Sequence, residues 1–80
     1  MPQYLTVPRG IRVNGAAIAA IRERSGYSGT EFAELIGIHR AYLSNVEAGH
    51  RKSVSPAVAK RIADGLKVPM PAILAESDAA

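Results

Sequence analysis

The sequence predicts an all-α fold of five short helices. Two observations lead to this prediction: apolar residues recur at helical spacing in several segments, and Gly, Ser or Pro separates each segment from the next. The 80 residues suffice for one domain, and 48 % of them are apolar. Because the chain has no Cys, packing alone must hold the fold together, without disulfides or thiolate metal sites.

The first helix is predicted over residues 16–24. Asn14 is a candidate N-cap, strong helix formers follow it, and Ser25-Gly26 ends the segment. Ile18 and Ile21 stand three residues apart, which places both on the same side of the helix.

The second helix begins at Ser28, which is followed three residues later by Glu31. This is the spacing of a capping box, in which each side chain accepts a hydrogen bond from the other residue's backbone N–H. Gly37, which readily adopts positive φ, ends the helix after two turns, so the next helix leaves at a steep angle. The helix is predicted to present one broad apolar face, formed by Phe32, Ala33, Leu35 and Ile36.

The third helix is predicted over residues 39–48, and Gly49 closes it. At 100° per residue, one side of this helix carries Leu43, Val46 and Glu47. The opposite side is small and polar and carries Ala41, Asn45 and Ala48, flanked by Tyr42 and Ser44. The small residues Ala33 and Gly37 lie where the second and third helices approach. This pattern predicts a helix-turn-helix, whose second helix fits a DNA major groove about 12 Å wide.

Residues 50–54 form a basic loop, and Ser55-Pro56 is typical of a helix start. The fourth helix has an apolar stripe of Val58, Ala59, Ile62, Ala63 and Leu66. A last short helix begins near Met70-Pro71 and offers Ile73 and Leu74 to the core. The predicted domain therefore spans residues 14–75, and residues 76–80 are predicted to fray.

Residues 1–13 do not follow the helical pattern. Residues 4–7 and 11–13 each resemble a short strand, and Pro8-Arg9-Gly10 resembles the turn between them. A two-stranded ribbon is marginally stable by itself. Three alternatives stay open: the ribbon packs on the helices, pairs with a second subunit, or remains a flexible arm.

Basic residues outnumber acidic residues by ten to seven, and the sequence pI is near 9.7. The excess lies within residues 1–52, whereas residues 53–80 are balanced, so a polyanion would meet the first two-thirds of the chain. No apolar run approaches the roughly 20 residues that span a bilayer. Residues 1–13 also lack the basic and apolar regions of a signal sequence. We therefore expect a cytoplasmic protein with no membrane partner.

The stretch IRERSGYSGTEFAELIGIHRAYLSNVEAG, followed by RIADGLKV, resembles the Xre/Cro family of phage and bacterial repressors. The resemblance covers about residues 14–75. It implies a five-helix, lambda-repressor-like DNA-binding domain that acts as a homodimer, or as cooperating monomers, on double-stranded operator DNA. It also implies that Arg22 and Glu47 form an internal salt bridge.

Carried over by position, the resemblance assigns base reading to the third helix, at Arg40, Ala41, Tyr42, Ser44 and Asn45. It assigns phosphate contacts to Gly29, Thr30, Ala48, His50, Arg51 and Lys52. Gly29 stands where the family usually has Gln, so only backbone N–H groups remain for that phosphate. A minor-groove arm using Arg9 and Arg12 is one alternative for the N-terminal segment, and a structural cap on the helices is another.

Catalysis finds no support in the sequence. His39 and His50 are eleven residues apart with no Cys and no carboxylate cluster beside them, so we expect no metal site and no cofactor. Neither a Gly-rich phosphate loop nor a nucleophile paired with a base is present. The alternative to a transcriptional regulator is a protein-interaction module, such as an antitoxin or a phage-encoded modulator, that uses the small outward face of the third helix.

Overall fold

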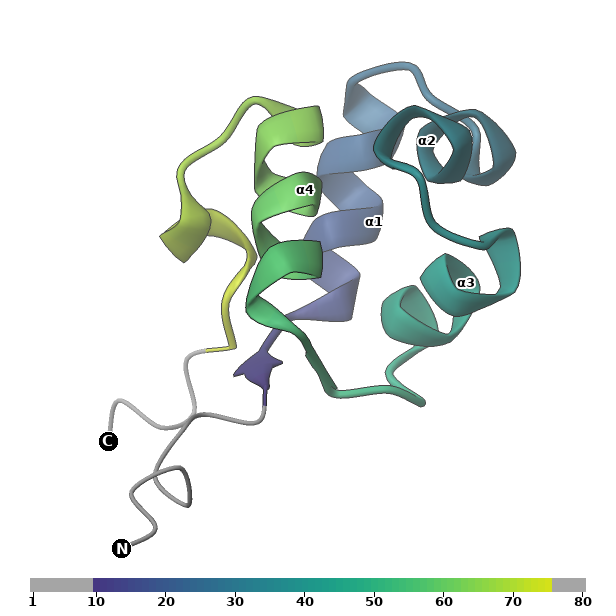
Figure 1. Ribbon diagram of the computed structural model, residues 1–80. Helices are drawn as coiled ribbons and strands as arrows, with labels where there is room; N and C mark the ends of the chain where they lie inside the picture. Colours follow the sequence, from purple (N-terminus) through teal and green to yellow (C-terminus); the bar gives the residue numbers. More distant parts are fainter. Residues whose placement is uncertain (1–9, 76–80) are drawn as a thin grey trace, which may run out of the picture.

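The computed structural model describes residues 10–75 (Figure 1). Four α-helices occur in this part of the chain: α1 (Gly15–Arg24), α2 (Gly29–Ile36), α3 (Arg40–Ala48) and α4 (Pro56–Leu66). A short 3₁₀-helix, η2 (Met70–Ile73), follows α4. Two short strands, β1 (Ile11–Arg12) and β2 (Ser53–Val54), complete the fold. The expected fifth α-helix is thus a single 3₁₀ turn, and the fold is not purely helical.

The caps predicted at the starts of α1 and α2 are confirmed by their hydrogen bonds. The Asn14 side chain accepts from the backbone N–H of Ala17 at 3.0 Å and caps α1. At the start of α2 the capping box is complete, because Ser28 Oγ accepts from Glu31 N and Glu31 Oε1 accepts from Ser28 N. Gly37 ends α2 with a φ of 76°, a left-handed conformation that favours glycine. The chain can therefore turn directly into α3.

The third helix begins one residue later than predicted. His39 is its N-cap, and His39 Nδ1 accepts a hydrogen bond from the backbone N–H of Ala41 at 3.1 Å. Histidine is not among the residues that usually cap helices, so this role cannot be predicted from the residue type. The cap fixes the first turn of α3 and thereby the direction in which that turn presents its side chains.

The core lies where the four α-helices and η2 meet. Helix α3 packs on both α1 and α2, and α4 packs on α2, α1 and η2, an arrangement that Figure 1 shows with α4 in front of α1. Large side chains that are fully buried come from every helix: Ile18, Phe32, Leu43, Val46, Ile62 and Ile73. Since both Leu43 and Val46 are buried, one face of α3 is held inside the domain and the other is presented outward.

Leu35 does not belong to the buried face predicted for α2. Its exposed fraction is 55 %, whereas Phe32, Ala33 and Ile36 are buried. In a helix of only eight residues the buried stripe is narrow, and Leu35 falls just beyond its edge. The apolar face of α2 is therefore narrower than its sequence predicts.

Residues 11–13 pair with segments that lie much later in the chain. Strand β1 pairs antiparallel with β2, with Ile11 opposite Val54 and Arg12 opposite Ser53. Val13 is buried and forms an isolated bridge with Leu74. The expected loop at residues 50–54 thus ends in a strand, and among the three alternatives for the N-terminal segment, β1 packs on the domain. The other strand expected, at residues 4–7, lies outside the described residues.

Candidate nucleic-acid interface

The outward face of α3 is exposed and carries the side chains predicted to read bases. Arg40, Ala41, Ser44 and Asn45 are all exposed, and Ala48 continues the same face. Tyr42 is half-buried and packs against the core. The Arg40 guanidinium and the Asn45 amide can each form two hydrogen bonds side by side. Both therefore stand on an open helix surface of small residues.

The start of α2 adds backbone donors near this face. Gly29 and Thr30 occupy the first turn of α2, where backbone N–H groups have no acceptor within the helix. The Ser28 side chain accepts a hydrogen bond from the N–H of Glu31, so the N–H groups of Gly29 and Thr30 take no part in the capping box. Gly29 and Arg40 line a common hollow of about 230 Å³ between α2 and α3. An anionic group at this hollow would meet the N-terminus of α2 and the Arg40 guanidinium, next to the paired Arg22 and Glu47 side chains, which also line it.

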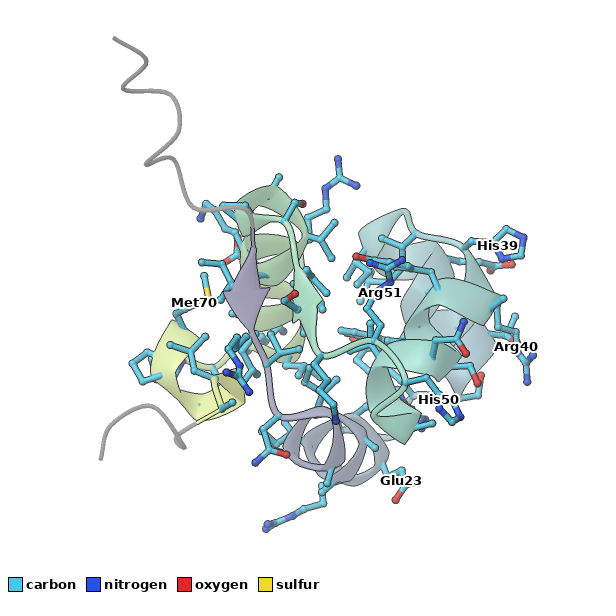
Figure 2. All side chains as sticks on the ribbon, turned by 90° about the horizontal axis from the view of Figure 1, so that it is seen from below. Glu23, His39, Arg40, His50, Arg51 and Met70 are labelled. Carbon is cyan, nitrogen blue, oxygen red and sulfur yellow. The ribbon has the colours of Figure 1, made fainter. Side chains whose placement is uncertain are left out.

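The loop after α3 folds back onto the helix that it follows. The backbone N–H groups of His50 and Arg51 both donate to the carbonyl oxygen of Asn45, at 3.0 and 3.1 Å. Lys52 follows, and the side chains of all three loop residues are exposed. Figure 2, which views the domain from below, shows His50 and Arg51 beside α3 and Arg40 near its other end. The cationic loop and the outward face of α3 consequently form one continuous surface.

Arg51 is held over the aromatic ring of Tyr42. The distance from Arg51 Cζ to the ring centre is 5.0 Å, within the range of a cation–π contact. This contact cannot be predicted from the sequence, because the two residues are nine positions apart and only the folded-back loop brings them together. A hollow of about 420 Å³ lies between this loop and α3. It is lined by Asn45, His50, Arg51, Lys52 and Ser53.

Arg22 and Glu47 form the ion pair that the family resemblance implies. Arg22 Nε donates to Glu47 Oε2 at 2.7 Å and Nη2 donates to Oε1 at 3.0 Å, while Nη1 donates to the carbonyl oxygen of Tyr27 at 2.8 Å. The two side chains are only 11 % and 14 % exposed. The hydrogen bonds that Arg22 donates to the Glu47 carboxylate raise the pKa of Arg22 above its usual value. The pair joins α1 to α3 and fixes the rotation of α3 about its axis.

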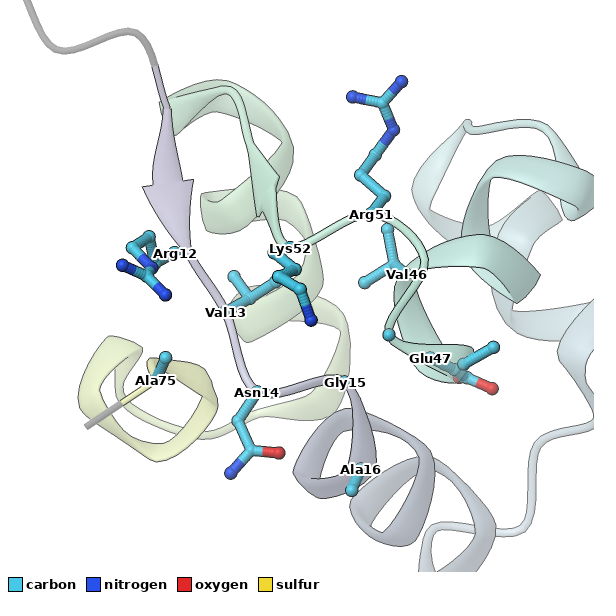
Figure 3. Close-up of a pocket in the computed structure, with 12 residues that line it drawn as sticks. Arg12, Val13, Asn14, Gly15, Ala16, Val46, Glu47, Arg51, Lys52 and Ala75 are labelled. Carbon is cyan, nitrogen blue, oxygen red and sulfur yellow. The ribbon is translucent and has the colours of Figure 1, made fainter. Parts of the chain in front are cut away.

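Arg12 lies on the opposite side of the loop from α3. It lines a hollow of about 390 Å³ with Lys52 and residues at the start of α1 and the end of α3 (Figure 3). The Arg12 side chain is exposed, and its backbone carbonyl accepts from Ala75. Arg9, the other residue of the expected minor-groove arm, lies outside the described residues.

Two further features of the described residues bear on the site. No helix within residues 10–75 is both long enough and apolar enough to cross a bilayer. In the same range, no three side chains of His, Asp or Glu come together as a metal site would require.

Comparison with known proteins places this geometry in a family. The sequence profile described as Helix-turn-helix matches residues 18–73. An HTH-type transcriptional regulatory protein, so named, from Pyrococcus horikoshii is 36 % identical over 72 residues, which is 86 % of this chain and 22 % of that protein. The chain spans only 13 % and 22 % of the lengths of two curated relatives that it matches.

Solved structures agree with the profile. The crystal structure of SinR, the master regulator for biofilm formation, in complex with DNA superposes with a TM-score of 0.70 at 29 % identity, covering 72 % of this chain and 95 % of that one. The restriction-modification controller protein C.AhdI from Aeromonas hydrophila gives a TM-score of 0.68 at 29 % identity, covering 72 % and 86 %. With the geometry of α2 and α3, these matches show that the chain belongs to the helix-turn-helix family of Xre/lambda-repressor-like transcriptional regulators.

Proposed function

We propose that this chain binds a specific sequence of double-stranded DNA and regulates transcription, as a Cro-like repressor of phage or bacterial origin does. The proposal rests on the exposed face of α3, where four side chains point outward: Arg40, Ala41, Ser44 and Asn45. Leu43 and Val46, on the other side, are buried and hold the helix in the core. A helix anchored on one side and polar on the other is what the major groove admits.

The bases are read by side chains of α3. The Asn45 amide pairs with the N6 and N7 atoms of adenine, and the Arg40 guanidinium pairs with O6 and N7 of guanine. Ala41 offers a methyl group to the methyl group of thymine, and Ser44 hydrogen-bonds to either kind of base. Tyr42 stands beside these residues on α3.

The DNA backbone is bound on both sides of α3 and fixes the register of the readers. On one side, the N–H groups of Gly29 and Thr30 point toward a phosphate from the start of α2. On the other side, Ala48 and the loop residues His50, Arg51 and Lys52 approach the neighbouring phosphates.

Two copies act together on the operator. Their α3 helices enter successive major grooves about 34 Å apart on a pseudo-palindromic site. In the same arrangement the N-terminal segment, with Arg9 and Arg12, lies along the adjacent minor groove or supports the domain beside it. A regulator of this kind works in the cytoplasm.

A gel-shift experiment with DNA fragments from around the chain's own gene tests the proposal. At low salt we expect at least one fragment to be retarded at concentrations that leave unrelated fragments unbound. If no fragment is retarded, the alternative function, a protein-interaction module built on the same fold, is favoured.

A further inference from the structure

The loop residue Arg51 and the helix residue Tyr42 form a unit that the roles assigned above do not explain. The family resemblance implies a phosphate contact for Arg51 and a base-reading position for Tyr42. In the structure Arg51 Cζ lies 5.0 Å from the centre of the Tyr42 ring, so the side chain turns back along α3. We propose that Tyr42 positions Arg51 as a reader of guanine, adjacent to Asn45. This inference rests on the proposed function, in which it replaces the phosphate contact of Arg51 and leaves those of Ala48, His50 and Lys52 unchanged.

The backbone brings Arg51 to the reading face. Gly49 ends α3, and the N–H of Arg51 then donates to the carbonyl oxygen of Asn45 at 3.1 Å. The loop therefore starts against the last turn of α3. Arg51 and Asn45 also line one hollow, of about 420 Å³, so a base edge entering it would meet both side chains.

The Tyr42 ring is a fixed support for the guanidinium. Tyr42 is half-buried and packed against the core, whereas the Arg51 side chain is exposed. A guanidinium whose face contacts a ring keeps its N–H groups, which lie in its plane, available to other partners. Such a planar fork matches the paired acceptors O6 and N7 of guanine.

Other charges do not compete for Arg51 within the part of the chain that the structure describes. The ion pairs there join Arg22 to Glu23 and Glu47, and Lys60 to Asp64. The ring of Tyr42 is thus the contact that orients the Arg51 guanidinium. Lys52, the next residue, offers a compact point charge with no fork, which suits a phosphate.

The test compares variants of the 80-residue chain on its selected operator and on all single-base-pair variants of that operator, at several salt concentrations. Tyr42→Leu removes the ring, Tyr42→Phe keeps the ring without its hydroxyl, and Arg51→Lys keeps the charge without the fork. Lys60→Gln, on the exposed side of α4, is the control for loss of one cation. Circular dichroism and thermal unfolding check that each variant is folded.

We expect Arg51→Lys and Tyr42→Leu to lose discrimination at the same G·C pair by about fivefold or more, with the other positions unchanged. Tyr42→Phe should retain that discrimination, because the ring supports Arg51 and the hydroxyl takes no part. The slope of log affinity against log salt should be the same for Arg51→Lys and the wild type, since the charge is conserved.

Three results would overturn the inference. Uniform weakening by Arg51→Lys on all operator variants would make Arg51 a phosphate contact. Equal losses in Tyr42→Phe and Tyr42→Leu would assign the effect to the hydroxyl. Loss of the same base preference in Lys60→Gln would mean that the effect comes from charge in general. Failure of the proposed function is distinguished at the first step, because the wild-type chain would then select no operator, and the inference would fall with it.

Discussion

The backbone of Gly15, at the start of α1, lies directly against the carbonyl oxygen of Val46, in the last turn of α3. A Cβ atom at Gly15 would overlap that oxygen, and it would also lie 2.9 Å from the carbonyl oxygen of Glu47 and 3.0 Å from Glu47 Cα. The obstruction consists of backbone atoms, which cannot move aside as a flexible side chain can. The position of α3 on the domain therefore depends on the absence of a side chain at residue 15.

Gly15→Ala is expected to destabilise the domain by about 1–3 kcal/mol, the usual cost of overpacking a close contact. This direction is opposite to that of an ordinary Gly-to-Ala change in a helix, which stabilises by up to about 1 kcal/mol. Gly29→Ala is the matched control, because a Cβ atom at Gly29 meets no atom within 4 Å. Urea denaturation measures both changes, and equal stabilities for the two variants would contradict the close contact.

Loss of the Arg22–Glu47 pair is expected to lower the free energy of unfolding more than Gly15→Ala does. Glu47→Ala leaves the Arg22 guanidinium, 11 % exposed, without its carboxylate, and we expect a loss of about 3–5 kcal/mol in the free energy of unfolding. The double variant Arg22→Met with Glu47→Ala should recover part of this loss, because no charge is then stranded. Thermal and urea unfolding of the single and double variants measure the coupling. Simple additivity of the two single changes would show that the pair contributes nothing.

The pair is not expected to act as a pH switch near neutrality. The pKa of Arg22 is raised in the folded state. The stability that the charged guanidinium contributes is therefore fully present at any pH below the usual pKa of Arg. It is lost only when the pH rises through the still higher pKa of the folded state. From the guanidinium we therefore expect no change in stability between pH 6 and pH 9. A urea midpoint that shifts over this range in the wild type, and does not shift in Arg22→Met, would contradict this.

Asn45→Ala and Lys52→Ala are expected to weaken DNA binding in different ways. Asn45→Ala should relax the preference at one base pair, with a loss of about 1–3 kcal/mol of discrimination there. Lys52→Ala should weaken binding to all sequences alike and make the salt slope shallower by about 0.9 for the lost phosphate contact. Competition binding on a randomised operator library separates the two effects. An unchanged sequence preference in Asn45→Ala would remove that residue from the base readers.

Leu35→Gln is expected to change the stability by no more than about 0.5 kcal/mol, as substitutions at exposed positions usually do. Leu35 is 55 % exposed, whereas Phe32, one turn earlier in α2, is fully buried. Phe32→Ala should therefore cost about 3–5 kcal/mol. Urea denaturation of the two variants compares them directly, and a large loss in Leu35→Gln would show that the apolar face predicted from the sequence was correct.

The features that could be predicted from the sequence depend on neighbours along the chain. The capping box joins Ser28 to Glu31 within one turn, and the conformation of Gly37 follows from its own lack of a side chain. The outward and inward sides of α3 follow from helical geometry once Leu43 and Val46 are placed in the core. For these features, local physics and the tertiary fold agree.

The features that could not be predicted depend on contacts between distant segments. Strand β1 pairs with β2 about 40 positions later, and two-residue strands carry too little alternation to indicate a partner. The contact of Gly15 with Val46 and that of Arg51 with Tyr42 arise only when α3 is docked. For Leu35, periodicity defines an apolar stripe but not its edge.

Selection of bound sites from random DNA tests the central claim most directly. If the outward face of α3 reads bases in two copies of the domain, the selected sequences should contain inverted repeats with half-sites about 10 base pairs apart. Binding to such a site by a dimer that neutralises roughly six to ten phosphates should weaken with salt at a log–log slope of about −5 to −9. A pool that stays random after selection, or an affinity that does not change with salt, would contradict the proposal.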